Sequence, residues 1–304
     1  MMNSHQFSVA SRWTEGAPQR IAMTGFAVTV VGLATWVSLL ATGDYTLVNA
    51  FFRYPSPLFT IAICSAEVLL CFQAWKRLEP SDALRPAWLW LSLAAVAHLV
   101  GRTLSTPGSA NVAATQTMSM NELGRIVAGP VQMSLLFAGL LNVVVHCRRL
   151  RLLRRLRPLD YALLAIVAGF VARTIHGISA FSGADKTVSF TTAALWTSDP
   201  LLLLLLATAV LIRRSIAPLG YGLLANCWRS FIAGIVLTAF GSASTWCLDC
   251  QVTPVWTSFG WYVWFVADCA FALGPAFQVA ALDHARSRAR VYSAFSDLAF
   301  WRIP

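Results

Sequence analysis

The chain has 304 residues, of which 57% are hydrophobic and only 12% are charged, and its mean hydropathy is +0.64. A soluble domain is usually about 45–50% apolar and about 25% charged. Because a folded chain still exposes much of its surface, these residues do not supply the polar groups that a water-soluble protein of this length needs. The composition therefore excludes a soluble enzyme or binding domain and indicates an integral membrane protein.

Apolar runs long enough to cross a bilayer, about 20 residues each, recur along the chain. They are too continuous for strands, and the alternating pattern of a membrane barrel is absent. The sequence therefore predicts an all-α integral membrane protein with an eight-helix transmembrane bundle. The predicted spans are Ile21–Ala41, Pro57–Trp75, Pro86–Leu104, Gly124–Val145, Asp160–Ile178, Ser198–Ile212, Arg229–Leu248 and Phe259–Leu282.

The basic residues predict the orientation of the bundle. If both termini are cytoplasmic, 18 of the 23 Lys and Arg residues fall in cytoplasmic segments, as the positive-inside rule requires. The net charge of +10 is then explained by a cytoplasmic face against anionic lipids rather than by nucleic-acid binding. We expect a multi-pass protein of the bacterial inner membrane.

Three regions follow from this topology. Residues 1–20 form a cytoplasmic N-terminal segment, residues 21–282 the eight-span transmembrane domain, and residues 283–304 a cytoplasmic tail. The tail places apolar side chains from Val291 to Phe300 among Arg and Ser, which suits an amphipathic helix on the inner leaflet.

Basic pairs follow alternate spans at Lys76-Arg77, Arg148-Arg149 and Arg213-Arg214, at steps of roughly 70 residues. Residues 99–104 (LVGRTL) also resemble residues 170–175 (FVARTI). Two interpretations stay open. The chain is either four repeated helical hairpins, or an unrepeated bundle whose alternating spans produce the same period.

Ionisable side chains inside spans are costly, so each is a functional hypothesis. Spacings of three and four residues place each Arg/His pair on one helix face. Together these residues predict a ligand- or ion-binding site that opens toward the outer side. The six residues are Glu67, Asp268, Arg173, His176, His98 and Arg102.

Less specific interpretations stay open for the same residues. Glu67 and Arg173 fit a structural ion pair, and Arg102 fits a side chain that reaches toward lipid headgroups. His98 and His176 fit bis-imidazole ligation of haem, although single histidines near span ends more often form interfacial hydrogen bonds. No other cofactor is indicated.

The seven cysteines carry no zinc-site motif, because a second C-x-x-C or a histidine cluster is absent. Structural thiols are the leading interpretation, and redox sensing or metal binding is the alternative. Cys64 and other cysteines within spans read as small apolar residues. Cys247 and Cys250 lie at the outer mouth of the seventh span and are candidates for a disulfide. Tryptophans near span ends, Trp88 among them, are explained by aromatic belts at the membrane interface.

Motifs of enzymatic chemistry are also absent. The sequence contains no glycine-rich phosphate loop, no H-E-x-x-H and no G-x-S-x-G, which favours a non-enzymatic protein.

The layout resembles the multi-pass membrane sensor regions of bacterial histidine kinases and diguanylate cyclases. The resemblance covers most of residues 57–290. It rests on residues 85–104 (RPAWLWLSLAAVAHLVGRTL), residues 198–215 (SDPLLLLLLATAVLIRRS) and the Trp-rich segment 256–288. No kinase, cyclase or coiled-coil segment follows in this sequence. Three interpretations stay open: an output domain has been lost, the signal passes to a partner protein, or the resemblance reflects membrane composition alone.

The leading expectation is therefore a non-enzymatic sensory or regulatory membrane protein. It would bind a small or lipophilic ligand in the outer half of the bundle and signal to a membrane or cytoplasmic partner. The alternatives are an ion-coupled small-molecule transporter that uses Glu67 and Asp268, and a haem- or pigment-associated subunit of an electron-transfer complex.

Overall fold

The computed structural model describes residues 24–43 except 26, 46–47, 50, 55–105, 120–152, 197–217, 222–248 and 254–300, with scattered residues between 158 and 172. Within these ranges every regular element is a helix and no strand occurs. The main elements are α3 (Pro55–Arg77), α4 (Arg85–Leu104), α5 (Met120–Ile126), the π-helical turn η2 (Val127–Val131), α6 (Gln132–Arg149), α9 (Ser198–Ile216), α10 (Leu223–Leu248) and α11 (Pro254–Phe300).

Several helices have the length and composition of membrane spans. Five such spans lie in the described part of the chain, at Leu58–Arg77, Arg85–Leu104, Glu122–Arg149, Leu223–Ser242 and Tyr262–Ser287. Large apolar side chains on their outward faces are exposed, for example Leu69 at 63% and Phe240 at 54%. An outer surface of this kind suits lipid rather than water. The described part of the chain is therefore all-helical and has the apolar helices of a multi-pass membrane protein.

Other predicted spans are described less completely. Shorter apolar helices occupy Ala27–Ala41 and Asp160–Gly169, within the first and fifth predicted spans. Helix α9 covers the sixth but has three charged residues, Asp199, Arg213 and Arg214, in its end turns. The full set of eight spans remains a prediction.

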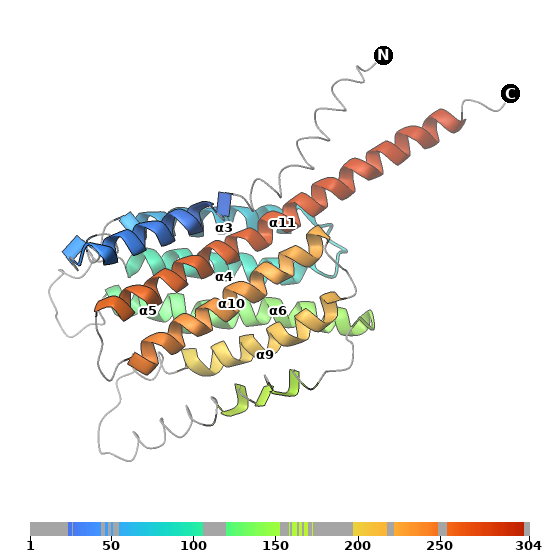
Figure 1. Ribbon diagram of the computed structural model, residues 1–304. Helices are drawn as coiled ribbons and strands as arrows, with labels where there is room; N and C mark the ends of the chain where they lie inside the picture. The colour runs from blue at the N-terminus through green and yellow to red at the C-terminus, as the bar shows by residue number, and fades with distance from the viewer. Residues whose placement is uncertain are drawn as a thin grey trace.

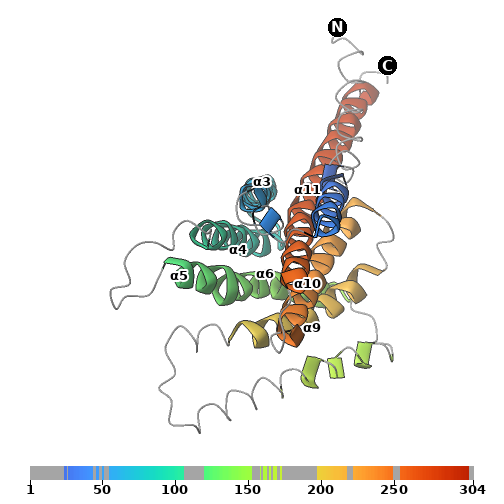
Figure 2. The ribbon, with the colours of Figure 1, turned by 60° about the vertical axis from the view of Figure 1, so that its left-hand side comes forward.

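Six long helices of the described part form a closed ring. Helix α3 contacts α4, α4 contacts α6, α6 contacts α9, α9 contacts α10, α10 contacts α11, and α11 returns to α3 (Figure 1). The early segment Ala27–Ala41 lies outside this ring beside α11 (Figure 2), where the Tyr262 hydroxyl donates to the carbonyl oxygen of Thr29 at 3.0 Å.

Basic side chains gather at one end of the ring, which we call the basic end. Helices α3, α6 and α9 finish there with Arg77, Arg149 and Arg214, and α4 begins there with Arg85. At this end Arg77 pairs with Asp283 of α11 at 2.5 Å. Arg214 of α9 also pairs with Asp160, whose side chain is almost fully buried.

Aromatic residues fill the ring near the basic end. Trp88 of α4 packs against Trp228 and Phe231 of α10, with ring centroids 5.9 and 6.1 Å apart. Trp88 is completely buried. Its assignment to an interfacial aromatic belt is therefore wrong, because its ring extends the core across the bundle instead of facing headgroups.

Helices α10 and α11 approach closely through two reciprocal contacts. Phe231 of α10 lies over Gly274 of α11, and Phe271 of α11 lies over Gly234 of α10. A methyl group at Gly274 would lie 2.6 Å from Cε2 of Phe231, too close for any side chain. Small residues of this kind let membrane helices pack closely.

Helix α11 is much longer than a span. It runs without interruption for 47 residues from Pro254 to Phe300, which is roughly 70 Å at 1.5 Å per residue. Its C-terminal part projects beyond the other helices (Figure 1). The boundary predicted at residues 282/283 is thus not marked by a break in the helix, and the predicted tail continues the line of the span.

Candidate functional site

Five polar or thiol side chains from three helices meet inside the ring, in the half away from the basic end. We call this group the polar cluster. Helix α3 contributes Cys64 and Glu67, helix α4 contributes His98 and Arg102, and helix α11 contributes Asp268. Spacings of three and four residues put each pair on one helix face.

His98 lies at the centre of the polar cluster. Its Nδ1 is 3.2 Å from Oε2 of Glu67, and its Nε2 is 3.2 Å from Oδ1 of Asp268. These three side chains are 3%, 7% and 4% exposed. The imidazole therefore bridges a carboxylate on α3 and a carboxylate on α11.

Arg102 closes the cluster toward the end opposite the basic end. Its Nη2 donates to both oxygens of Asp268, each at 3.1 Å, and its Nε lies 3.3 Å from Nε2 of His98. The alternative that Arg102 reaches toward lipid headgroups is wrong, because a buried carboxylate on α11 attracts the guanidinium into the bundle.

The charges of the cluster can balance. If His98 is protonated, it donates to both carboxylates, and with Arg102 it supplies two positive charges against Glu67 and Asp268. If His98 is neutral, Nδ1–H faces Glu67 and Nε2 accepts from Arg102, but the cluster then keeps one net negative charge, so the charges balance only in the protonated form. Since an unpaired charge in a low-dielectric interior is costly, mutual pairing is what permits these groups to be buried.

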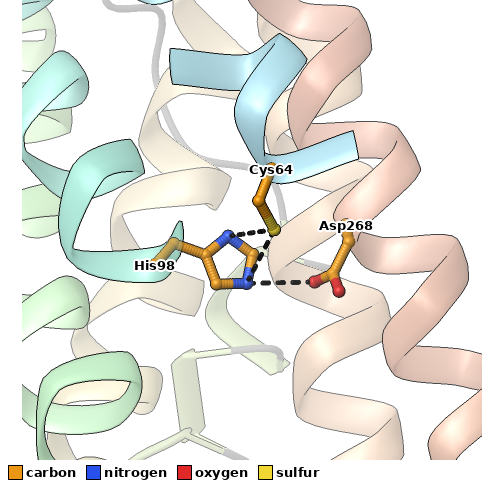
Figure 3. A group of neighbouring side chains, drawn as sticks. All are labelled: Cys64, His98 and Asp268. Carbon is orange, nitrogen blue, oxygen red and sulfur yellow. Dashed lines mark hydrogen bonds and ion pairs between the residues drawn. The ribbon is translucent and has the colours of Figure 1, made fainter. Parts of the chain in front are cut away.

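Cys64 completes the site and was not expected in it. Its Sγ lies 3.7 Å from Nδ1 and 3.9 Å from Nε2 of His98 (Figure 3). The donor atoms of Cys64, His98 and Asp268 all lie within 4.8 Å of one another, and all three residues are buried. The spacing of three between Cys64 and Glu67 was the available signal, but a thiol in an apolar helix reads as a small hydrophobic residue.

Close packing holds the end of α4 that presents Arg102. A methyl group at Gly101 would lie 2.4 Å from the backbone nitrogen of Ala128 in η2. Pro130 lies within this π-helical turn and is buried. Such turns are rare and are often found at functional sites. Here the turn brings its backbone against α4 one residue before Arg102.

The structure thus brings together four of the six predicted residues, namely Glu67, His98, Arg102 and Asp268. The other two, Arg173 and His176, lie outside the described residues, as do the side chains of Cys247 and Cys250. The expected Glu67–Arg173 pair is therefore not described, and the described partner of Glu67 is His98. Haem ligation by His98 would require a ring nitrogen to leave its present partners.

Comparisons with protein-family models, with curated proteins and with solved structures find no match. The polar cluster itself is consequently the basis for a functional assignment.

Proposed function

We propose that the chain is a sensory or regulatory protein of the bacterial inner membrane. A small ligand binds at the polar cluster, and α11 transmits the change to a partner protein. The support is the position of Asp268: it belongs to α11, yet it is held by His98 and Arg102 of α4. This is the observation on which the proposal rests.

Helix α11 has the form of an output element. From Asp268 it continues unbroken to Phe300, roughly 48 Å further along the helix axis. A shift or rotation of α11 at the polar cluster would therefore reach the part that projects from the bundle. The C-terminal part past the basic end offers a partner a continuous helix.

A second contact holds α11 more weakly. Arg77 pairs with Asp283, and Arg286 donates from Nη2 to the carbonyl oxygen of Arg77 at 2.6 Å. The Arg77 and Asp283 side chains are 29% and 34% exposed, and ion pairs with this degree of solvent access contribute about 1 kcal/mol or less. A ligand that changes the contacts of Asp268 could thus shift α11 without breaking a strong contact at the basic end.

A photo-crosslinking experiment in native membranes tests this proposal. Tyr292 is replaced by a benzophenone amino acid in the wild-type chain and in the Asp268→Asn variant. One control places the same amino acid at the lipid-facing Leu93. The other is the variant Ser92→Ala, because the Ser92 hydroxyl donates to the carbonyl oxygen of Trp88 on its own helix.

We expect a discrete protein adduct from position 292 that changes in yield with Asp268→Asn and does not change with Ser92→Ala. An absence of any protein adduct at position 292, or an adduct that is indifferent to Asp268→Asn, would overturn the proposal.

An ion-coupled transporter is the second candidate, because Glu67 and Asp268 converge on one imidazole inside the bundle. Proteoliposomes made with the purified chain test it. Substrate flux that is lost in the double variant Glu67→Gln/Asp268→Asn supports transport, and flux that survives in this variant excludes it.

A further inference from the structure

The donor atoms of the polar cluster match those of a transition-metal site. A thiol sulfur, an imidazole nitrogen and a carboxylate oxygen converge from Cys64, His98 and Asp268. Thiolate and imidazole ligands select zinc and similar ions, whereas Mg²⁺ and Ca²⁺ prefer all-oxygen sites. We propose that the polar cluster binds a divalent transition-metal ion of the zinc class. This inference names the ligand of the site in the proposed function and rests on that function.

The spacing of the donors is close to that of a coordinated ion. Around tetrahedral zinc, with bonds of about 2.0–2.3 Å, neighbouring ligand atoms are separated by roughly 3.3–3.6 Å. In the cluster, Nε2 of His98 is 3.9 Å from Sγ of Cys64 and 3.2 Å from Oδ1 of Asp268. All three donor atoms lie within 4.8 Å of one another, so Sγ of Cys64 must move closer to Nε2 of His98 for the three atoms to share one ion.

Glu67 fits the role of an orienting partner. Histidines that bind metals through one nitrogen usually donate the other N–H to a carboxylate, which fixes the ring and its tautomer. Nδ1 of His98 faces Oε2 of Glu67 at 3.2 Å, so Nε2 is left for the ion. On binding, Arg102 gives up its contact with Nε2 and keeps its contact with Asp268.

The occupied site is electrically balanced. A Cys64 thiolate and the carboxylates of Glu67 and Asp268 supply three negative charges. Arg102 supplies one positive charge and a divalent ion supplies two. The sum is zero, which is the condition for burying so many charges inside a membrane bundle. Arg102 is therefore part of the balance and not an obstacle to it.

Three protein ligands leave one coordination position open, as in zinc sites that exchange a ligand. The ion would also connect α3, α4 and α11 at a single point. Metal binding would thereby change the contacts of Asp268, the residue through which the proposed signal reaches α11.

Metal binding is tested on the purified, metal-stripped full chain in detergent. The probes are Zn²⁺ alone, measured as bound metal per chain, and Co²⁺ alone, measured by absorption. We expect one ion per chain and a thiolate-to-cobalt charge-transfer band in the near ultraviolet.

The decisive variant is Cys64→Ser, because it removes the thiolate and leaves every ion pair of the cluster in place. It should abolish the charge-transfer band and weaken Zn²⁺ binding at least 10-fold. Glu67→Gln should weaken binding about 10–100-fold, as for other carboxylates that orient a ligating histidine. Cys71→Ser is the matched control, since Cys71 is equally buried on the same helix and lies outside the donor group, and it should bind like the wild type.

A chain that binds no Zn²⁺, or Co²⁺ absorption and Zn²⁺ affinity that are equal in wild type and Cys64→Ser, would overturn the metal site. If the crosslink at position 292 still depends on Asp268 in that case, the proposed function stands and only the identity of the ligand is wrong. If the metal binds but the crosslink is indifferent to Asp268, the metal site stands and the proposed signalling route is wrong.

Discussion

Arg102 of α4 donates from one guanidinium nitrogen to both carboxylate oxygens of Asp268 on α11, at 3.1 Å each, across 166 positions of sequence. Helices α4 and α11 are not neighbours in the ring, because α3 lies between them. This contact therefore crosses the bundle interior. With His98 it is a polar link between the early and late parts of the chain.

The first prediction concerns the strength of that link. Arg102→Gln and Asp268→Asn should each lower the free energy of unfolding by about 3 kcal/mol, because each removes one member of a buried ion pair. The double variant should cost less than the sum of the two, with a coupling energy of about 1–3 kcal/mol. Denaturant titration of the wild type, the two single variants and the double variant in one detergent measures this coupling energy. Strictly additive effects would show that the two side chains do not interact.

The second prediction concerns Trp88. Its indole Nε1 is buried and has no hydrogen-bond partner among the described residues. Trp88→Phe removes this unsatisfied donor and keeps most of the ring, so it should lower the free energy of unfolding by less than about 1 kcal/mol. Trp88→Ala should lower it by about 3–5 kcal/mol because it opens a cavity.

Trp90 provides the control for Trp88, since it is two residues away on α4 and 38% exposed. Its replacement by alanine should change the free energy of unfolding by no more than about 0.5 kcal/mol. Equal losses at the two tryptophans would contradict the aromatic core.

The third prediction concerns the packing of α10 on α11. Gly274→Ala places a methyl group against the Phe231 ring and should lower the free energy of unfolding by about 1–3 kcal/mol. Gly169→Ala is the comparison, because nothing lies within 4 Å of a methyl group at Gly169. A Gly274→Ala protein as stable as Gly169→Ala would mean that the two helices are further apart than described.

The fourth prediction concerns orientation. The concentration of Arg and Lys at the basic end predicts that this end faces the cytoplasm. A fluorescent-protein fusion after Leu152 should be fluorescent, and a phosphatase fusion after Ser105 should be active, because phosphatase matures only outside. The reverse pattern would invert the topology and place the C-terminal part of α11 outside the cell.

Much of the polar cluster could be predicted from the sequence, because charged residues in apolar spans are rare and conspicuous. Glu67 and Asp268 were found in this way, and the spacing of His98 and Arg102 placed them on one face. Their pairing could not be derived. The pairing depends on which helices are neighbours. Contacts between helices, such as that of Phe231 on α10 with Gly274 on α11, decide this.

Three other features could not be predicted from the sequence around them. Cys64 was missed because its chemistry appears only when His98 of another helix lies against it. Trp88 was assigned to the interface because it is near a span end, whereas its burial depends on Trp228 across the ring. The seventh span was predicted to begin at Arg229, but helix α10 begins earlier, at Leu223. A charged residue can limit the apolar run without ending the helix.

The most direct test of the link between the polar cluster and the output helix is amide hydrogen exchange along α11 of the full chain in nanodiscs. Wild type, Asp268→Asn and the control Ser92→Ala are compared over residues 283–300. Coupling through α11 predicts that Asp268→Asn changes exchange throughout residues 283–300, which lie 15 or more residues from the substitution, and that Ser92→Ala does not. A change confined to the residues around 268, with 283–300 identical in all three proteins, would contradict it.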